Sequence, residues 1–133
     1  MKFINPPGLN NPSTYGYTQA VVVPSGSKLV YLAGQYGADE NDNLVADDFA
    51  TQMKQSFANL RTALAAVGAT PEDVVKITIL SVDHDEEKLR LISAERNSFW
   101  SNHKPASTLI PVPRLAVDGM LFEIDAVAVI PNS

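Results

Sequence analysis

Two carboxylates interrupt an apolar segment near the end of the chain. Residues 120–130 read MLFEIDAVAVI, and alternation along a strand places Glu123 and Asp125 on a face shared with one Leu and two Val. A charged group on such a half-buried face loses hydration, so we expect it to have either a partner of opposite charge or a functional role. Either carboxylate can hold or activate a water beside a cleft. Either can also form an ion pair across a subunit interface, with Arg114 or Lys76 as partner, and spacing leaves both interpretations open.

A second unusual segment, residues 103–115, reads HKPASTLIPVPRL. It has the aliphatic and β-branched residues of a strand, yet proline cannot donate a hydrogen bond to a sheet. The three prolines at 105, 111 and 113 therefore predict a strand at a sheet edge, at a bulge or beside a cleft. His103 opens the segment, and we expect it to be a surface loop residue rather than a proton shuttle.

Two polar stretches resemble metal sites and are rejected. Residues 39–48 place an Asp and two Asn at the first, third and fifth positions of a calcium loop, but Leu44 and Ala50 replace its glycine and its glutamate. His84 lies among acidic residues in a turn where Asp85 suits a helix N-cap. We expect no bound metal at either stretch.

Composition narrows the class of protein. The chain has 133 residues, 45% of them hydrophobic, which suits one domain with a core. It has no apolar run long enough to span a bilayer and no cysteine, so we expect a cytoplasmic protein without disulfides or membrane contact. A net charge of −5 disfavours binding to nucleic acid.

The segments that must position these residues follow from hydrophobic spacing. Apolar residues recur every three or four positions over 47–67, which predicts a helix that ends near Gly68. A second helix is expected over 85–101, with Arg96 and Trp100 on its more apolar face. Residues 1–16 are expected to be an irregular N-terminal arm. Strands are expected at 18–23, 28–35, 74–82, 103–115 and 120–130.

The order is therefore β-β-α-β-α-β-β within a single domain, 1–133. Turn residues at 24–27 predict that the first two strands form a hairpin. Two helices can cover only one face of such a sheet, while the other face also carries Val, Ile and Leu. We expect an oligomer that buries this second face.

Five short motifs, in order, resemble the RidA/YjgF family over about Tyr15 to Pro131. They are Tyr17-Thr18-Gln19-Ala20, Leu32-Ala33-Gly34-Gln35, Gln52 with Asn59-Leu60, Gly68 with Asp73-Val74-Val75-Lys76, and Phe122-Glu123-Ile124-Asp125-Ala126. The resemblance implies a chorismate-mutase-like α+β protomer with two helices on one face of a mixed sheet. It also implies a homotrimer with inward-facing sheets and ligand clefts between subunits.

The resemblance further implies hydrolysis of reactive imines and enamines, such as those that pyridoxal-phosphate enzymes release from serine and threonine. The family uses neither metal nor cofactor. Its glutamate, which positions the attacking water, corresponds to Glu123. Its tyrosine and glycine correspond to Tyr17 and Gly34.

The family's substrate-binding arginine has no counterpart, because the Pro-Ala-Arg-Ser motif here reads Pro-Ala-Ser107-Thr108. Ser107 and Thr108 are the expected substrate-binding residues at this place. Losing a bidentate arginine–carboxylate pair weakens binding by about a hundredfold or more, so a substrate other than the standard 2-imino acids is expected. Ser93 and Arg96 replace a common asparagine and a common aromatic residue, and Arg96 is expected to be exposed or in an interface ion pair.

Two functions remain open. One is a hydrolase of a small imine or enamine in clefts between subunits. The other is a non-catalytic trimer of the same family that binds or senses a small molecule, which Ser107 favours. Ribonuclease activity, an older label for relatives, is disfavoured by the acidic balance and by the absence of an obvious His/Lys site.

Overall fold

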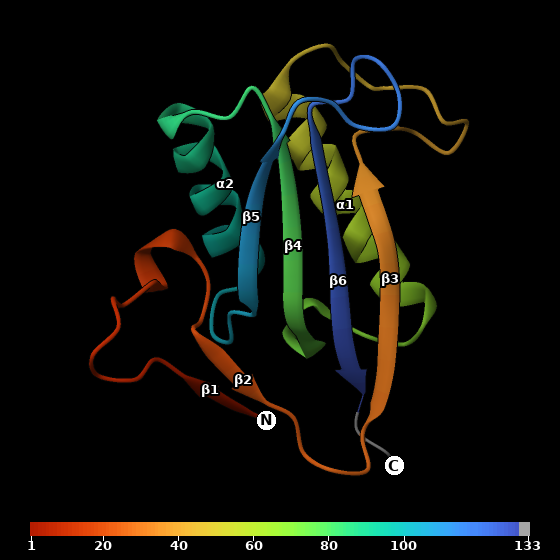
Figure 1. Cartoon of the computed structure of the whole chain (residues 1–133). Coiled ribbons are helices and arrows are strands. Elements are labelled where there is room, and N and C mark those ends of the chain that lie inside the picture. Colours follow the sequence, from red (N-terminus) through yellow and green to blue (C-terminus); the bar gives the residue numbers. More distant parts are fainter. Residues whose placement is uncertain (131–133) are drawn as a thin grey trace.

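A four-stranded sheet backed by two helices forms the body of the protein in the computed structural model, which describes residues 1–130. The strand order is β3-β6-β4-β5, with β4 and β5 parallel and the other neighbours antiparallel (Figure 1). The bounds are β3 (Lys28–Tyr36), β4 (Val74–Val82), β5 (Ala106–Val112) and β6 (Phe122–Ile130). The predicted α+β architecture with a mixed sheet is confirmed. The expected domain and the family likeness also reach residues 131–133, which lie outside the described residues.

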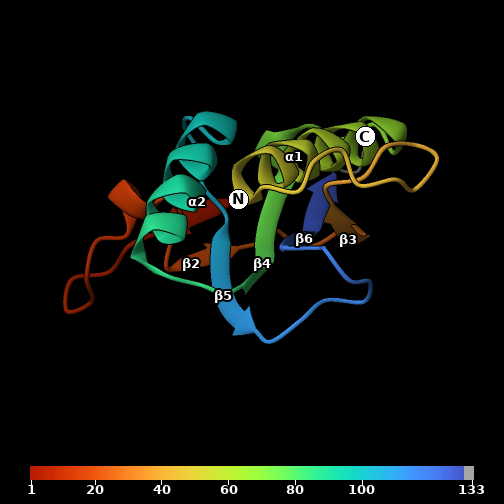
Figure 2. The same ribbon diagram turned by 90° about the horizontal axis from the view of Figure 1, so that it is seen from above.

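Both predicted helices are present and lie on the same face of the sheet (Figure 2). Helix α1 (Phe49–Ala66) starts after Asp48, whose carboxylate accepts a hydrogen bond from the Thr51 amide at 2.9 Å. Helix α2 (Glu86–Phe99) starts after Asp85, which caps it in the same way. The acidic residues predicted at the two helix starts thus satisfy free backbone amides there.

The core lies between the helices and the sheet. Alternate residues of β4 and β6 point into it, as the sequence pattern predicts, and they pack against the apolar faces of α1 and α2. Trp100 is fully buried and its indole nitrogen donates to the Pro71 carbonyl at 2.7 Å, in the short 3-10 helix η2 (Pro71–Asp73). The expected core position of Trp100 is confirmed.

The predicted hairpin between residues 18–23 and 28–35 is wrong. The turn exists, with the Ser27 hydroxyl bonded to the Pro24 carbonyl, but it joins strands of different sheets. Strand β2 (Ala20–Val22) pairs with β1 (Lys2–Ile4), while β3 pairs with β6. Turn residues cause the chain to change direction, but they do not determine which strands pair. The long ladder of paired residues between β3 and β6 determines the partner of β3.

The N-terminal arm is more regular than expected. Residues predicted to be coil form β1 and a 3-10 helix, η1 (Ser13–Tyr15). Because β1 pairs with β2, this arm folds back beside α2 and the β5 edge (Figure 1). The arm thereby approaches the proline-containing segment 103–115, which includes β5.

Strand β5 is an edge strand, as its prolines predicted. It pairs only with β4 along its length, and Pro111 lies opposite Ser81 within that ladder. A single bridge between Thr18 and Ala106 ties its beginning to the arm. An edge position removes the need for a donor on one side of the strand, which is why proline is tolerated.

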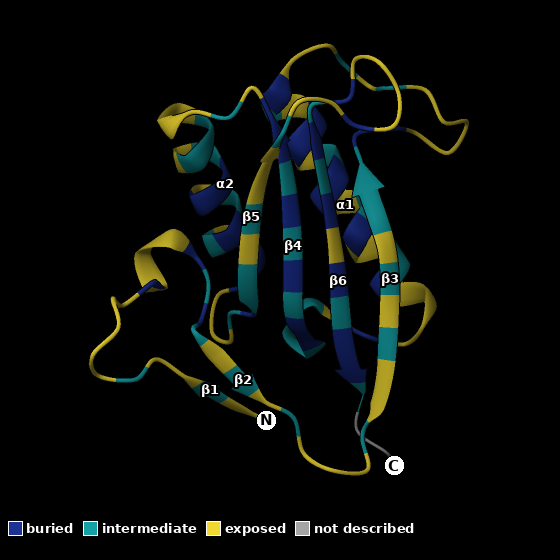
Figure 3. Ribbon diagram, viewed as in Figure 1, coloured by how far each residue is buried: buried dark blue, intermediate teal, exposed yellow. Residues whose placement is uncertain are grey.

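The face of the sheet that points away from the helices remains partly exposed. Figure 3 shows exposed residues along the outer strands β3 and β5, while β4 and β6 are more buried. Leu29 and Tyr31 on β3 and Ile110 on β5 are exposed large apolar residues there, and Tyr31 retains 75% of its accessible surface. No helix within residues 1–130 has the length and apolar character to cross a membrane.

Candidate functional site

Glu123 lies where sequence analysis placed it, on the face of β6 opposite the helices. It is half-buried, opposite Leu80 on β4 and Tyr36 on β3. Burial, and secondarily the charge of nearby Asp125, raises the pKa of the Glu123 carboxyl above its ordinary value. A carboxylate that is poorly hydrated and readily protonated is suited to accept and return a proton.

Gly34 lies directly against Glu123. A Cβ atom added at position 34 would collide with the Glu123 carboxylate. The ladder between β3 and β6 is irregular here, with a register shift between Leu32 and Gln35. The glycine therefore leaves the carboxylate free of a neighbouring side chain, and we call Gly34 and Glu123 the Glu123 group.

Two amides on α1 hold the loops around the Glu123 group. The Gln52 amide donates to the carbonyls of Ala46 and Gly119 and accepts from the Leu121 amide, at 2.8–3.0 Å. The Asn59 amide donates to two carbonyls at the end of β3 and just beyond it, each at 2.9 Å. These are two of the motif residues behind the family resemblance, and the structure gives them a positioning role that the sequence did not reveal.

The N-terminal arm brings Tyr17 to the opposite edge of the sheet. The Thr18 amide donates to the Pro105 carbonyl at 3.0 Å, and Asn97 on α2 donates to the Thr14 carbonyl at 2.9 Å. Gly16 has a positive φ, and a Cβ there would lie 2.6 Å from the Cβ of Arg96. The arm can therefore rest directly on α2, with Tyr17 beside Arg96.

Arg96 departs from its sequence-based prediction. It was expected to be exposed or in an interface ion pair, but it retains only 2% of its accessible surface. Its Nη1 donates to the Ser107 hydroxyl at 3.0 Å, and its guanidinium carbon lies 5.4 Å from the Tyr17 ring centre. The helix turns Arg96 inward because the arm and β5 close over it. We call Tyr17, Arg96 and Ser107 the Arg96 group.

The Arg96 guanidinium has few hydrogen-bonding partners and no counter-ion among residues 1–130. Its Nε is buried without a hydrogen bond, and no ion pair involves it among residues 1–130. Burial lowers the pKa of Arg96 to about 10, partly offset by Tyr17. A positive charge from α2 thus lies beside Ser107, the residue that stands in place of the arginine in the family motif.

The remaining candidates lie elsewhere. Thr108 points to the opposite face of β5 from Ser107, is exposed and accepts a hydrogen bond from Lys76 at 2.7 Å. Arg114 pairs with Asp118 at 3.1 Å, so neither proposed cation contacts Glu123 within the protomer. His103 is exposed, as expected, and stacks on Phe3. Residues 1–130 contain no cluster of three potential metal ligands.

The two groups do not meet within one protomer. Ser107 lies opposite Ile77 on β4, whereas Glu123 lies opposite Leu80, and the two side chains emerge on opposite faces of the sheet. Two strand spacings and three residues of rise separate their backbones by roughly 14 Å. A single small molecule cannot contact both groups unless another copy of the chain supplies one of them.

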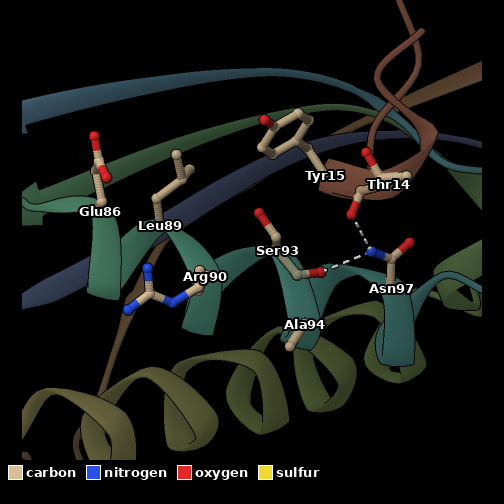
Figure 4. Close-up of a pocket in the computed structure, with 8 residues that line it drawn as sticks. All are labelled: Thr14, Tyr15, Glu86, Leu89, Arg90, Ser93, Ala94 and Asn97. Carbon is tan, nitrogen blue, oxygen red and sulfur yellow. Dashed lines mark hydrogen bonds between the residues drawn. The ribbon is translucent and has the colours of Figure 1, made fainter.

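Two adjoining hollows lie between α2, the arm and β5. The smaller has a volume of about 270 Å³ and is lined by Tyr17, Arg96, Ser107 and Leu109 among others. The larger, about 730 Å³, lies between η1 and α2 (Figure 4). Tyr15 and Leu89 line both, so the hollows are neighbours along α2. Asn97, which lines the larger hollow, donates a hydrogen bond to the Thr14 carbonyl (Figure 4).

Comparison with known proteins decides the family. A family model described as Endoribonuclease L-PSP matches residues 9–130. The chain belongs to this family, the RidA/YjgF group. The order of the five sequence motifs agrees with that membership, and a Rid-family structure shares the fold.

Individual relatives cover nearly the whole chain. The 2-iminobutanoate/2-iminopropanoate deaminase of Salmonella typhimurium is 32% identical over 90% of this chain and 92% of its own length. The human protein of that name is 31% identical over 85% of this chain and 79% of its own. The structure of the Rid-family protein YyfB from Yersinia pestis has a TM-score of 0.90 and 35% identity, and 96% of each chain is covered.

Proposed function

We propose that the protein is a metal-independent hydrolase that deaminates a small reactive imine or enamine. The observation that carries the proposal is the half-buried Glu123 carboxylate, whose pKa is raised by burial and whose neighbour, Gly34, leaves it unobstructed. The deaminase names of relatives such as the Salmonella typhimurium protein support the reaction class.

The chemistry requires one base that becomes an acid. Glu123 accepts a proton from water as the water oxygen attacks the imine carbon, which forms a C–O bond and leaves the electron pair on nitrogen. The protonated carboxyl returns that proton to nitrogen, which gives a carbinolamine. Glu123 then takes the carbinolamine hydroxyl proton and passes it to nitrogen. The C=O bond forms as the C–N bond breaks with its electron pair on nitrogen, and ammonia and a carbonyl compound leave. An enamine enters the same sequence after it has taken a proton on carbon. A carboxyl with a raised pKa performs both halves efficiently near neutral pH.

The active site, in this proposal, is a cleft between subunits. The separation of the Glu123 group from the Arg96 group supports it, because each protomer carries both groups too far apart for one substrate. The exposed Leu29, Tyr31 and Ile110 also support burial of this face by another copy. The trimeric number rests on the family resemblance.

The choice of substrate depends on position 107. Because serine stands in place of the family's arginine, we expected a substrate other than the standard 2-imino acids. The Arg96 guanidinium, which is bonded to Ser107, places a cation at this site and weakens that expectation. The first test therefore includes 2-iminobutanoate together with imines that lack a carboxylate.

The test is to generate each imine in situ and follow its loss with wild-type protein, Glu123→Gln and Asp125→Asn. Loss of a general base lowers the rate by about 10²–10⁴-fold, so Glu123→Gln should remove most acceleration. Asp125→Asn, on the same strand and face, should stay within a few-fold of wild type at pH 8.

Equal rates for Glu123→Gln and wild type would contradict the proposed role of Glu123. If the wild-type protein accelerates no imine yet binds a small molecule saturably, the function is the binding or sensing role that Ser107 favours. Steady ammonia release by the wild type excludes that second function.

A further inference from the structure

The Arg96 guanidinium is a buried charge without a counter-ion. It retains 2% of its accessible surface, and its hydrogen bond to Ser107 is to a neutral hydroxyl. Leaving a buried charge without an opposite charge is costly, and proteins keep such groups where a ligand or partner completes them. The described residues supply no carboxylate within ion-pair distance of Arg96.

A second buried polar atom without a partner lies on the same helix. The Ser93 hydroxyl, one turn before Arg96, makes no hydrogen bond, although the Ser93 carbonyl accepts from Asn97 (Figure 4). Ser93 lines the larger hollow and Arg96 lines the smaller one. Together they place one cationic donor and one hydroxyl along the adjoining hollows under the arm.

Arg96 lines the smaller hollow and can present its charge to a molecule there. Nη1 is bonded to Ser107, and Nε is buried without a partner. A hydrogen bond from a charged guanidinium to a carboxylate is stronger than one between neutral groups. The smaller hollow, about 270 Å³, lies just below the range of roughly 300–1,000 Å³ for ligand pockets, which suits a small molecule.

We propose that Arg96 is the anion-binding residue of this site, supplied from α2 in place of the missing arginine on β5, and that its ligand is a small monocarboxylate. Ser107 is its positioning residue, and Tyr17 covers the guanidinium. The ligand class rests on the proposed function, since the Glu123 group and the Arg96 group must then hold one molecule. The substrate is accordingly a 2-imino acid, and the product is the corresponding 2-oxo acid.

A binding experiment tests this without turnover. Calorimetry measures the affinity of the whole protein for 2-oxobutanoate and for 2-oxobutanamide, which lacks the charge. The wild type and Glu123→Gln should both prefer the acid. Arg96→Met should lose about a hundredfold in affinity for the acid and little for the amide.

Two further variants separate ligand binding from a structural role. Arg61→Met removes an exposed arginine of α1 that lines neither hollow, and this variant should bind like wild type. Ser107→Arg in the Arg96→Met background returns a guanidinium from β5 and should restore preference for the acid. Thermal unfolding of Arg96→Met should occur at a higher temperature than wild type, because an uncompensated buried charge is gone.

The inference is overturned if Arg96→Met binds the acid as wild type does, or if wild type fails to distinguish acid from amide. It is also overturned if Arg96→Met dissociates the oligomer while the protomers keep their affinity for the acid, since Arg96 would then pair with a partner subunit. Failure of the proposed function looks different. In that case Arg96-dependent binding of the acid remains, but no imine is hydrolysed faster than in buffer.

Discussion

At the scale of single residues, Glu123 and Arg96 are both charges in places where hydration is reduced. Burial raises the pKa of Glu123 and lowers that of Arg96, so each is destabilised in its charged form. A chain selected only for stability would carry neutral side chains at both positions. We therefore assign both charged side chains a functional role. The stability cost of keeping the charge can be measured.

Glu123→Gln should make the folded protein more stable at pH 7. The folded-state pKa of Glu123 lies above the unfolded value, so ionisation costs stability at neutral pH. That cost is fully present above the raised pKa and disappears as the pH falls to 4.5 and below, the ordinary value for this carboxyl. Thermal unfolding from pH 8 to pH 4 should therefore show the variant's advantage shrink with falling pH.

The control for this comparison is Asp47→Asn, which replaces an exposed carboxylate just before α1 and should change stability at pH 7 by no more than about 0.5 kcal/mol. A Glu123→Gln protein that is less stable than wild type at pH 7 would mean that the carboxylate makes a stabilising contact in the assembled protein. Glu123 would then be structural.

The sequence allowed Glu123 to be placed well, because alternation along one strand fixes its face. Arg96 could not be placed in this way. Its position on the apolar face of a helix was visible, but its burial depends on the arm, which the glycine at position 16 allows to lie against α2. That contact joins residues about 80 apart in the chain, and local spacing carries no information about it.

At the scale of elements, α1 does more than cover the sheet. Gln52 is fully buried and its amide satisfies two carbonyls and one amide in the segments before and after the Glu123 group. Asn59 does the same at the end of β3. Since buried backbone groups must be paired, these two side chains fix loops that have no regular structure of their own.

Gln52→Met should lower the free energy of unfolding by about 2–4 kcal/mol, because a side chain of similar volume leaves three hydrogen-bonding groups unpaired. Urea titration measures the loss. Lys54→Met, on the exposed side of the same helix, should change stability by no more than about 0.5 kcal/mol. Equal stability of the two variants would show that water replaces Gln52 at no cost.

Elements with strong internal patterns were predictable, and pairings were not. Both helices and β4 and β6 follow from periodicity and capping residues. The hairpin of β2 and β3 was wrong because turn residues specify a bend without specifying a sheet. The short strand β1 escaped notice because three residues among prolines and asparagines give no alternation to detect.

At the scale of the whole molecule, the Glu123 group lies on β3 and β6, whereas Ser107 of the Arg96 group lies on β5. Figure 1 shows β3 and β5 at opposite edges of the sheet. The face that carries Glu123 exposes apolar side chains that another copy could bury. An oligomer that places the β3 edge of one protomer beside the β5 edge of the next would join the two groups. The proposed site is thus a property of the assembly.

Mixed oligomers of Glu123→Gln and Arg96→Met test this central claim most directly. Each variant alone should hydrolyse the imine that the wild type accepts at a small fraction of the wild-type rate. After co-expression, a site that takes Glu123 from one subunit and Arg96 from its neighbour is intact in about a quarter of cases with random assembly. The account predicts activity near that fraction. Mixed oligomers no more active than the separate variants would contradict a site shared between subunits.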